Sequence, residues 1–178
     1  ESGDPAATDP AGEGQDGNDS PWSDFKEWMD IAYAPALKMG NDAIREVDPD
    51  AYVGIGGGQM PGWGGYDYSR IAKSLTAVEP YDIGNNIEII RSLNPAMAVV
   101  TTAFARGPWE QNRVWYEMLH GNRGLIIWDD KAAFVNTDNS LGERGLEVAP
   151  YYKELTGGIA TQLINSERLS DPIAIHYS

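Results

Sequence analysis

The sequence predicts an α/β protein with a parallel sheet, because short apolar segments alternate with longer segments of helical period. The apolar segments start near residues 52, 81, 97 and 124, and a helical pattern follows each of them. The last of them, Leu125 to Trp128, contains no polar residue, which is typical of a strand covered on both faces. Four strand–helix repeats predict parallel strands, helices outside the sheet and right-handed crossovers.

The composition limits the class of protein and of ligand. The 178 residues suffice for one domain with a core, and no apolar run approaches the ~20 residues that a bilayer span needs. The net charge of −14 opposes binding to nucleic acid or anionic membranes and favours neutral or cationic ligands, although a soluble or salt-adapted surface is the simpler explanation of the charge. The chain has no cysteine and no cluster with metal-ligand spacing, so no cofactor is expected.

The first segment is predicted to be a loop, and the second a long helix. Residues 1–20 are rich in Gly, Asp, Pro and Ala without any hydrophobic period, and their aspartates do not fit the spacing of an EF-hand. Ser20 and Pro21 are typical of a helix start, and an apolar stripe then continues to Val47. Pro35 is expected to kink or divide this helix.

A strand over residues 51–56 leads into a glycine-rich loop that ends at Tyr66. The loop lacks the Gly-Lys-Ser/Thr of a phosphate-binding loop and has Gln59 where a dinucleotide fingerprint needs a small residue, which disfavours a nucleotide-dependent α/β enzyme. Trp63 and Tyr66 favour a binding rim, because aromatic faces stack on the flat apolar faces of sugars. A flexible connector with incidental aromatic residues is the alternative.

The remaining elements follow from the same patterns. Asn85 and Asn86 are expected to cap the helix that runs to about Ser92. In chain order we expect a helix over 69–78, a strand over 81–84, a helix over 86–92, a strand over 97–104, a helix over 108–120, a strand over 124–128, a loop to 147, a helix over 149–164, a linker over 166–171 and the start of a strand over 172–178.

Several segments resemble one family of glycoside hydrolases. The stretches from Tyr81 to Ser92 and from His120 to Asp129 are similar to the last strands of the barrel in family 42 β-galactosidase-like enzymes of clan A. The acidic start at Glu1 resembles the end of the fourth strand in that clan. The tail from Ala149 to Tyr177 resembles the passage of these enzymes into a trimerisation domain with a Rossmann-like sheet.

The resemblance implies the C-terminal half, strands five to eight, of a (β/α)8 TIM barrel that leads into a second α/β domain. Residues 1–20 would then be the loop after strand four, residues 21–165 the half-barrel, and residues 166–178 a linker and the first strand of the next domain. It also implies a retaining glycosidase of carbohydrate metabolism, present here as a fragment. Its partners would be a carbohydrate, the N-terminal half-barrel of the same polypeptide and two further copies in a trimer, in a bacterial cytoplasm or secreted.

The resemblance assigns catalytic roles as well. Glu1 would be the acid/base, but the strand over 97–104 ends without the carboxylate that serves the family as nucleophile. Glu88 and Asp129 are the candidates for that role, although a glutamate in a first helical turn also compensates the helix dipole. Asp129 and Asp130 equally fit a pair that caps the following turn.

The candidate substrate-binding residues are mostly aromatic or amide side chains that follow the predicted strands. They are Trp63, Tyr66, Asn85, Asn86, Trp109, Trp128 and Asp130. Trp128 matches the tryptophan that forms the floor of the sugar subsite in the family, and packing within the barrel is its alternative role. Because the carboxylate after the strand over 97–104 is missing, a catalytically inactive carbohydrate-binding protein on the same barrel is the alternative function.

Overall fold

The computed structural model describes residues 20–81, 83, 85–103, 106–129, 133–169 and 171–176, and their fold is α/β, as predicted. Four strands form one parallel sheet in the order β1-β2-β3-β4, so neighbours in the sequence are neighbours in the sheet. The described residues divide into two compact units, one from residues 1–78 and 83–97 and the other from residues 79–82 and 98–178.

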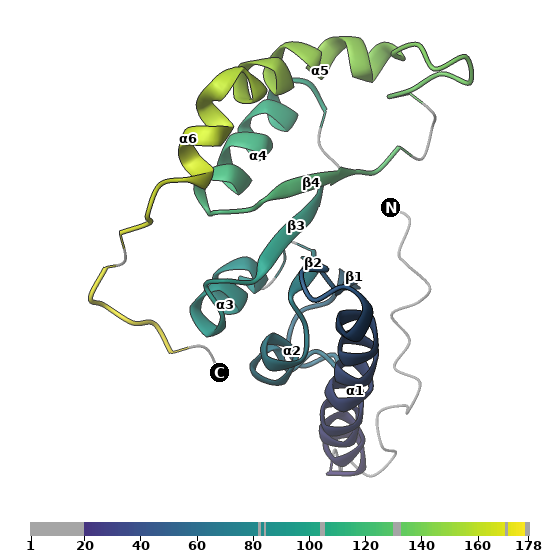
Figure 1. Ribbon diagram of the computed structural model, residues 1–178, viewed down its shortest axis with the longest axis vertical. Coiled ribbons are helices and arrows are strands. Elements are labelled where there is room, and N and C mark those ends of the chain that lie inside the picture. The colour runs from purple at the N-terminus through teal and green to yellow at the C-terminus, as the bar shows by residue number, and fades with distance from the viewer. Residues whose placement is uncertain are drawn as a thin grey trace. The chain divides into compact units, whose positions relative to one another are not determined.

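The elements alternate along the chain as strands and helices (Figure 1). In order they are α1 (Ser20–Val47), β1 (Gly54–Gly58), α2 (Tyr68–Ser74), β2 (Ala77–Pro80), α3 (Asn86–Leu93), β3 (Ala98–Ala103), α4 (Gly107–Leu119), β4 (Gly124–Ile127), α5 (Glu143–Glu154), the π-helix η2 (Leu155–Ile159) and α6 (Ala160–Ile164). The predicted helices that became α3 and α4 and the strands that became β3 and β4 agree with these bounds to within one or two residues.

The core of the first unit is formed mainly by α2, α3 and the strand segments beside them, and α2 packs against both α1 and α3. Its fully or nearly buried apolar side chains include Val53, Ile71, Ala72, Leu75, Val78, Ile87 and Ile90. The amide Nδ2 of Asn94, just after α3, donates to the carbonyl of Ala72 over 2.9 Å and so ties the end of α3 to α2. Helix α1 runs unbroken through Pro35, so the expected division of this helix is wrong.

In the second unit, helices cover one face of the strand pair β3–β4. The two strands are parallel, with Val100 opposite Gly124 and Thr102 opposite Ile126. Helices α4, α5 and α6 lie together beside them (Figure 1). Leu125 packs against the buried cluster of Val114, Met118 and Leu155 from these helices. The next side chain, Ile126, points to the opposite face and is 45% exposed, because successive side chains of a strand alternate between faces.

A buried polar cluster joins the end of α4 to β3. Nδ2 of Asn122 donates to Oε2 of Glu117 over 2.8 Å and also to Oγ1 of Thr101, and all three side chains are buried. Nε of Arg113, one helical turn before Glu117, lies 2.8 Å from Oε1 of that glutamate. The cluster therefore neutralises a buried carboxylate and fixes the turn that leads into β4.

The helix predicted over 69–78 and the strand predicted over 81–84 are both wrong in their bounds. Helix α2 ends at Ser74, and strand β2 begins at Ala77, where the backbone N–H donates to the carbonyl of Val53 over 3.0 Å. Tyr81 and Ile83 are in no strand, and residues 82 and 84 lie outside the described residues. The error has a physical reason: Val78 continues the helical period of α2, and only the pairing partner decides that it belongs to a strand.

The C-terminal part also differs from the prediction. The helix expected from residue 149 begins at Glu143, six residues earlier, so the loop before it is shorter than predicted. Within the described residues 171–176 no strand is present, and residues 177–178 lie outside the description.

Two glycines at the start of α5 let the loop after β4 lie directly on the helix. A Cβ atom at Gly142 would collide with the backbone carbonyl of Ala133, and one at Gly145 with that of Phe134. These carbonyls accept hydrogen bonds from the first turn of α5, including one of 2.9 Å from the backbone N–H of Arg144. A side chain at either glycine would therefore push the loop away from the helix.

We expect Gly145→Ala to lower the free energy of unfolding by about 1–3 kcal/mol, which is the usual cost of overpacking. Gly157→Ala is the matched control, because nothing lies within 4 Å of a Cβ at that position in η2. Urea denaturation followed by circular dichroism measures both variants. Equal stability of the two variants would contradict the close contact between the loop and α5.

Candidate functional site

Trp128 and Asp129 directly follow strand β4, at its carboxyl end. Parallel α/β sheets carry their ligand-binding and catalytic residues at this end of the strands. The side chain of Trp128 is 54% exposed, whereas its backbone carbonyl accepts a hydrogen bond of 2.6 Å from Nη1 of Arg144. The site therefore combines an exposed indole with a backbone carbonyl that is hydrogen-bonded to a buried arginine.

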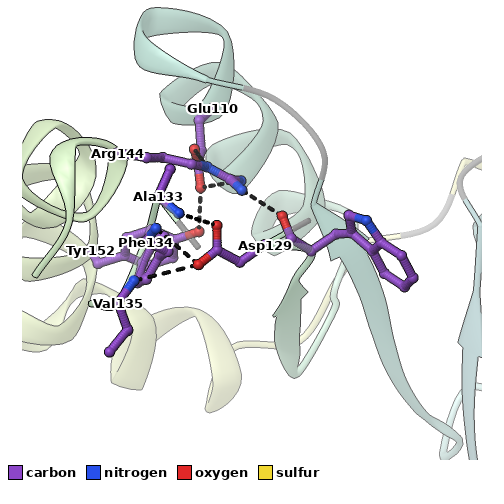
Figure 2. A network of polar contacts seen from close by, with 8 residues as sticks. Glu110, Asp129, Ala133, Phe134, Val135, Arg144 and Tyr152 are labelled. Carbon is purple, nitrogen blue, oxygen red and sulfur yellow. Dashed lines mark hydrogen bonds and ion pairs between the residues drawn. The ribbon is translucent and has the colours of Figure 1, made fainter. Parts of the chain in front are cut away.

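Arg144, on α5, is bound in turn by Glu110 on α4. Nε of Arg144 donates to Oε2 of Glu110 over 3.0 Å, and Nη2 donates to Oε1 over 3.2 Å (Figure 2). Glu110 is completely buried and Arg144 is 3% exposed. A buried charge needs an opposite charge and a full set of hydrogen bonds, and the two-pronged geometry of guanidinium and carboxylate supplies both.

Tyr152 and Phe134 complete the surroundings of this ion pair. The hydroxyl of Tyr152 donates to Oε1 of Glu110 over 3.1 Å, and the guanidinium of Arg144 lies 5.7 Å from the centroid of the Phe134 ring. Burial, and then the negative charge of Glu110, raise the pKa of Tyr152 well above its usual value. Tyr152 therefore keeps its proton and donates a hydrogen bond to Glu110.

Asp129 holds the loop that follows the site. Its Oδ1 accepts a hydrogen bond of 2.8 Å from the backbone N–H of Ala133, and its Oδ2 accepts bonds of 2.9 and 3.4 Å from those of Phe134 and Val135. Burial acts to raise the pKa of Asp129, but the three N–H donors and the positive charge of Arg144 outweigh it and lower that pKa below its ordinary value. The carboxylate is thus ionised and engaged at both oxygens.

Glu110 is one of the acidic residues that the sequence places near the strand ends, but neither its pairing with Arg144 nor a role for Tyr152 was predicted. Glu110 and Arg144 are 34 residues apart, so no local spacing links them. Arg144 was also assigned to a loop rather than to a helix. The available signal was that Glu110, Val114 and Glu117 recur at helical spacing, and the structure shows that all three lie on the buried face of α4.

In the first unit, the loop after β1 closes on α1 around an open aromatic pocket of about 480 Å³. Its walls are formed by Trp28, Met29, Ala32, Tyr33, Ala36, Gly64, Gly65 and Tyr66. The rings of Tyr33 and Tyr66 meet edge to face at 6.1 Å. Gly64 has a φ of +90°, and a Cβ there would collide with the end of the Met29 side chain. Trp63 is 53% exposed on the same loop but does not line the pocket.

The other predicted site residues lie in different surroundings. In the first unit, Glu88 is half-buried in the first turn of α3 and Asn86 is fully buried. Asn85 is exposed at the N-cap with a φ of 59°, and its side chain makes no capping hydrogen bond, so the expected cap by this side chain is wrong. In the second unit, Trp109 is 77% exposed beside a shallow hollow with Asn112, Arg113 and Tyr116. Glu1 and Asp130 lie outside the described residues.

Across the part of the chain that the structure describes, no group of three or more His, Cys, Asp or Glu side chains is placed to hold a metal ion. Within the same residues, no helix has the length and apolarity of a membrane span. No protein-family model, curated protein or solved structure matches the chain.

The lowered pKa of Asp129 predicts a pH-dependent contribution to stability. Because the folded-state pKa is below the unfolded one, the contribution is fully present above about pH 4, the unfolded pKa, and is lost as pH falls through the folded pKa. We therefore expect Asp129→Asn to destabilise the protein at pH 7 and to have a smaller effect near pH 3. Urea unfolding at several pH values tests this, and an effect of Asp129→Asn that is independent of pH would contradict it.

Proposed function

We propose that this chain is the C-terminal half of the (β/α)8 barrel of a retaining, family 42 β-galactosidase-like glycoside hydrolase, and that Trp128 binds a sugar ring. The observation that carries the proposal is the exposed indole of Trp128 on an anchored backbone at the carboxyl end of β4. A stacking platform must keep one face accessible, and the carboxyl end of the strands is where a barrel binds its ligand. The sequence around Trp128 supports the same role through its resemblance to that family.

The arrangement of the strands is compatible with half a barrel. The strand order follows the sequence, and in the second unit the helices lie on one face of β3–β4 while Ile126 is exposed on the other. In a closed barrel the helices cover the outer face, and side chains like Ile126 fill the interior. An N-terminal half-barrel of the same polypeptide would cover that inner face. From the family resemblance we also propose that the full-length protein forms a trimer.

For the chemistry, a retaining mechanism needs two carboxyl groups about 5 Å apart, one as acid/base and one as nucleophile. We propose Glu1 as the acid/base. Glu88 ranks ahead of Asp129 as its partner, because three backbone N–H groups already occupy both oxygens of Asp129. A carboxylate so stabilised is a weaker nucleophile and is needed to hold the loop after β4.

A catalytically inactive, carbohydrate-binding protein is the second candidate function. The observation that favours it is the sequence of β3, Ala98–Ala103, which contains no carboxylate although the resemblance places the nucleophile on this strand. Binding of sugar at Trp128 is common to both candidates, whereas turnover distinguishes them.

We expect Trp128→Ala in the full polypeptide to weaken binding of β-galactosides by about tenfold, because stacking on one ring contributes on the order of a kcal/mol. Tyr52→Ala is the control, since Tyr52 is an aromatic residue with 78% exposure that precedes the amino end of β1, whereas Trp128 follows the carboxyl end of β4. Titration calorimetry with a panel of oligosaccharides measures both. Unchanged affinity in Trp128→Ala would exclude Trp128 as the platform.

Hydrolysis of an aryl β-galactoside tests the catalytic assignment. Glu88→Ala should abolish turnover, and azide should restore it with an inverted glycosyl azide as product, since azide replaces the missing nucleophile. Glu1→Ala should slow poor leaving groups far more than good ones, because only the former need a proton. Full activity of Glu88→Ala would transfer the role to Asp129 or Asp130, and sugar binding without turnover in the unmodified protein would favour the inactive binding protein.

A further inference from the structure

We propose that Arg144 is the positioning residue for Trp128, and that the buried ion pair with Glu110 determines how well the indole receives its ligand. This inference rests on the proposed function only in taking the ligand to be a sugar. Arg144 is 3% exposed and has no access to a ligand, so it can affect binding only through the residues that it holds, of which Trp128 is one.

The first step concerns the carbonyl of Trp128. Strand β4 ends at Ile127, so this carbonyl lies beyond the paired strand and takes a hydrogen bond from a side chain. Nη1 of Arg144 supplies that bond over 2.6 Å. Because the donor is charged, the bond is stronger than one between neutral groups and restricts rotation of the peptide that carries the indole.

The second step is that Arg144 is itself immobile. Two of its nitrogens are bound to the two oxygens of Glu110, and the Phe134 ring lies beside the guanidinium. Glu110 belongs to α4 and Arg144 to α5. The carbonyl of Trp128 is therefore tied to two helices of the same unit through one planar group, which has no alternative position in which all three hydrogen bonds persist.

The third step is a second anchor, on the residue that directly follows Trp128. Asp129, the next residue, is held by three backbone N–H groups of residues 133–135. The loop containing them is bound to α5 through the backbone N–H of Arg144, which donates to the carbonyl of Ala133 over 2.9 Å. Arg144 thus acts on Trp128 directly and, through its own backbone, on the loop that holds Asp129. Because the backbone that carries the ring is held in this way, binding costs less conformational freedom.

A lysine at position 144 would keep the positive charge but not this geometry. One ammonium group cannot reproduce the two parallel bonds to Glu110 and also reach the carbonyl of Trp128 in the planar arrangement that arginine provides. Arg113→Lys is the matched control, because Arg113 also pairs with a completely buried glutamate of the same unit, Glu117, which accepts a hydrogen bond from Asn122 ahead of β4.

The experiment uses the full polypeptide labelled with 5-fluorotryptophan, in which the Trp128 resonance of the fluorine NMR spectrum is assigned by Trp128→Phe. In Arg144→Lys we expect the Trp128 resonance to shift or broaden while the resonances of Trp28 and Trp63 stay in place. Affinity for the best-binding oligosaccharide should fall about three- to tenfold, because the ring loses its preorganisation. Arg113→Lys should change neither the Trp128 resonance nor the affinity.

The outcomes separate this inference from the proposed function. If no oligosaccharide moves the Trp128 resonance of the unmodified protein, the proposed function fails. If a sugar moves it but Arg144→Lys leaves resonance and affinity unchanged, the positioning role is refuted. Should Arg144→Lys not fold, which movement of all tryptophan resonances would reveal, Glu110→Gln takes its place. Its amide keeps one acceptor oxygen for Arg144 but replaces the other oxygen with an NH2 donor, which breaks the two-pronged pair. An unchanged Trp128 resonance in a folded Glu110→Gln variant would refute the inference equally.

Discussion

The buried ion pair of Glu110 and Arg144 is the interaction on which the second unit depends. It joins α4 to α5, supports the backbone at the end of β4 and lies under the loop of residues 133–135. Removing one partner of such a pair leaves an uncompensated buried charge, at a cost of about 3–5 kcal/mol. A pair of apolar residues would serve stability equally well in many proteins, so stability alone does not explain a charged pair here.

The directionality of the pair offers an explanation. An apolar contact would hold α4 and α5 together but would not orient the carbonyl of Trp128, whereas a guanidinium distributes its hydrogen bonds in fixed directions within one plane. Glu110 uses both oxygens on Arg144, and Tyr152 adds a third donor to that carboxylate. The network therefore gives a defined position to the backbone that carries the exposed ring, which burial alone would not do because burial has no direction.

A second constraint is the absence of room between the loop after β4 and α5. Gly142 and Gly145 have no side chain because backbone carbonyls occupy the space that a Cβ would need. The polar cluster of Glu117, Asn122 and Thr101 plays a comparable part at the start of β4, where it fixes the turn that precedes the strand. Strand β4 is therefore held by polar groups at both ends and by apolar packing of Leu125 in between.

The sequence by itself determined the elements whose signals are local. The unbroken apolar run from Leu125 predicted β4, and the helical period over residues 108–120 predicted α4, because backbone preference and side-chain periodicity act over a few residues. The position of Trp128 and Asp129 after a strand end followed from the same patterns. The roles that the resemblance assigned to Glu1, Glu88 and Trp128 stay predictions.

Only the tertiary structure decided which distant residues meet. The sequence pattern places Val78 in a helix, but the pairing of its neighbour Ala77 with Val53 places it in a strand. The pattern likewise places Arg144 in a loop, whereas in the structure it lies in a helix and pairs with Glu110, 34 residues away. The pocket lined by Tyr66 is a further case. It includes Trp28 of α1, and the sequence pattern of α1 does not predict that these two residues share a pocket. Pairing between strands and neutralisation of a buried charge depend on contacts distant in sequence, and no local spacing records them.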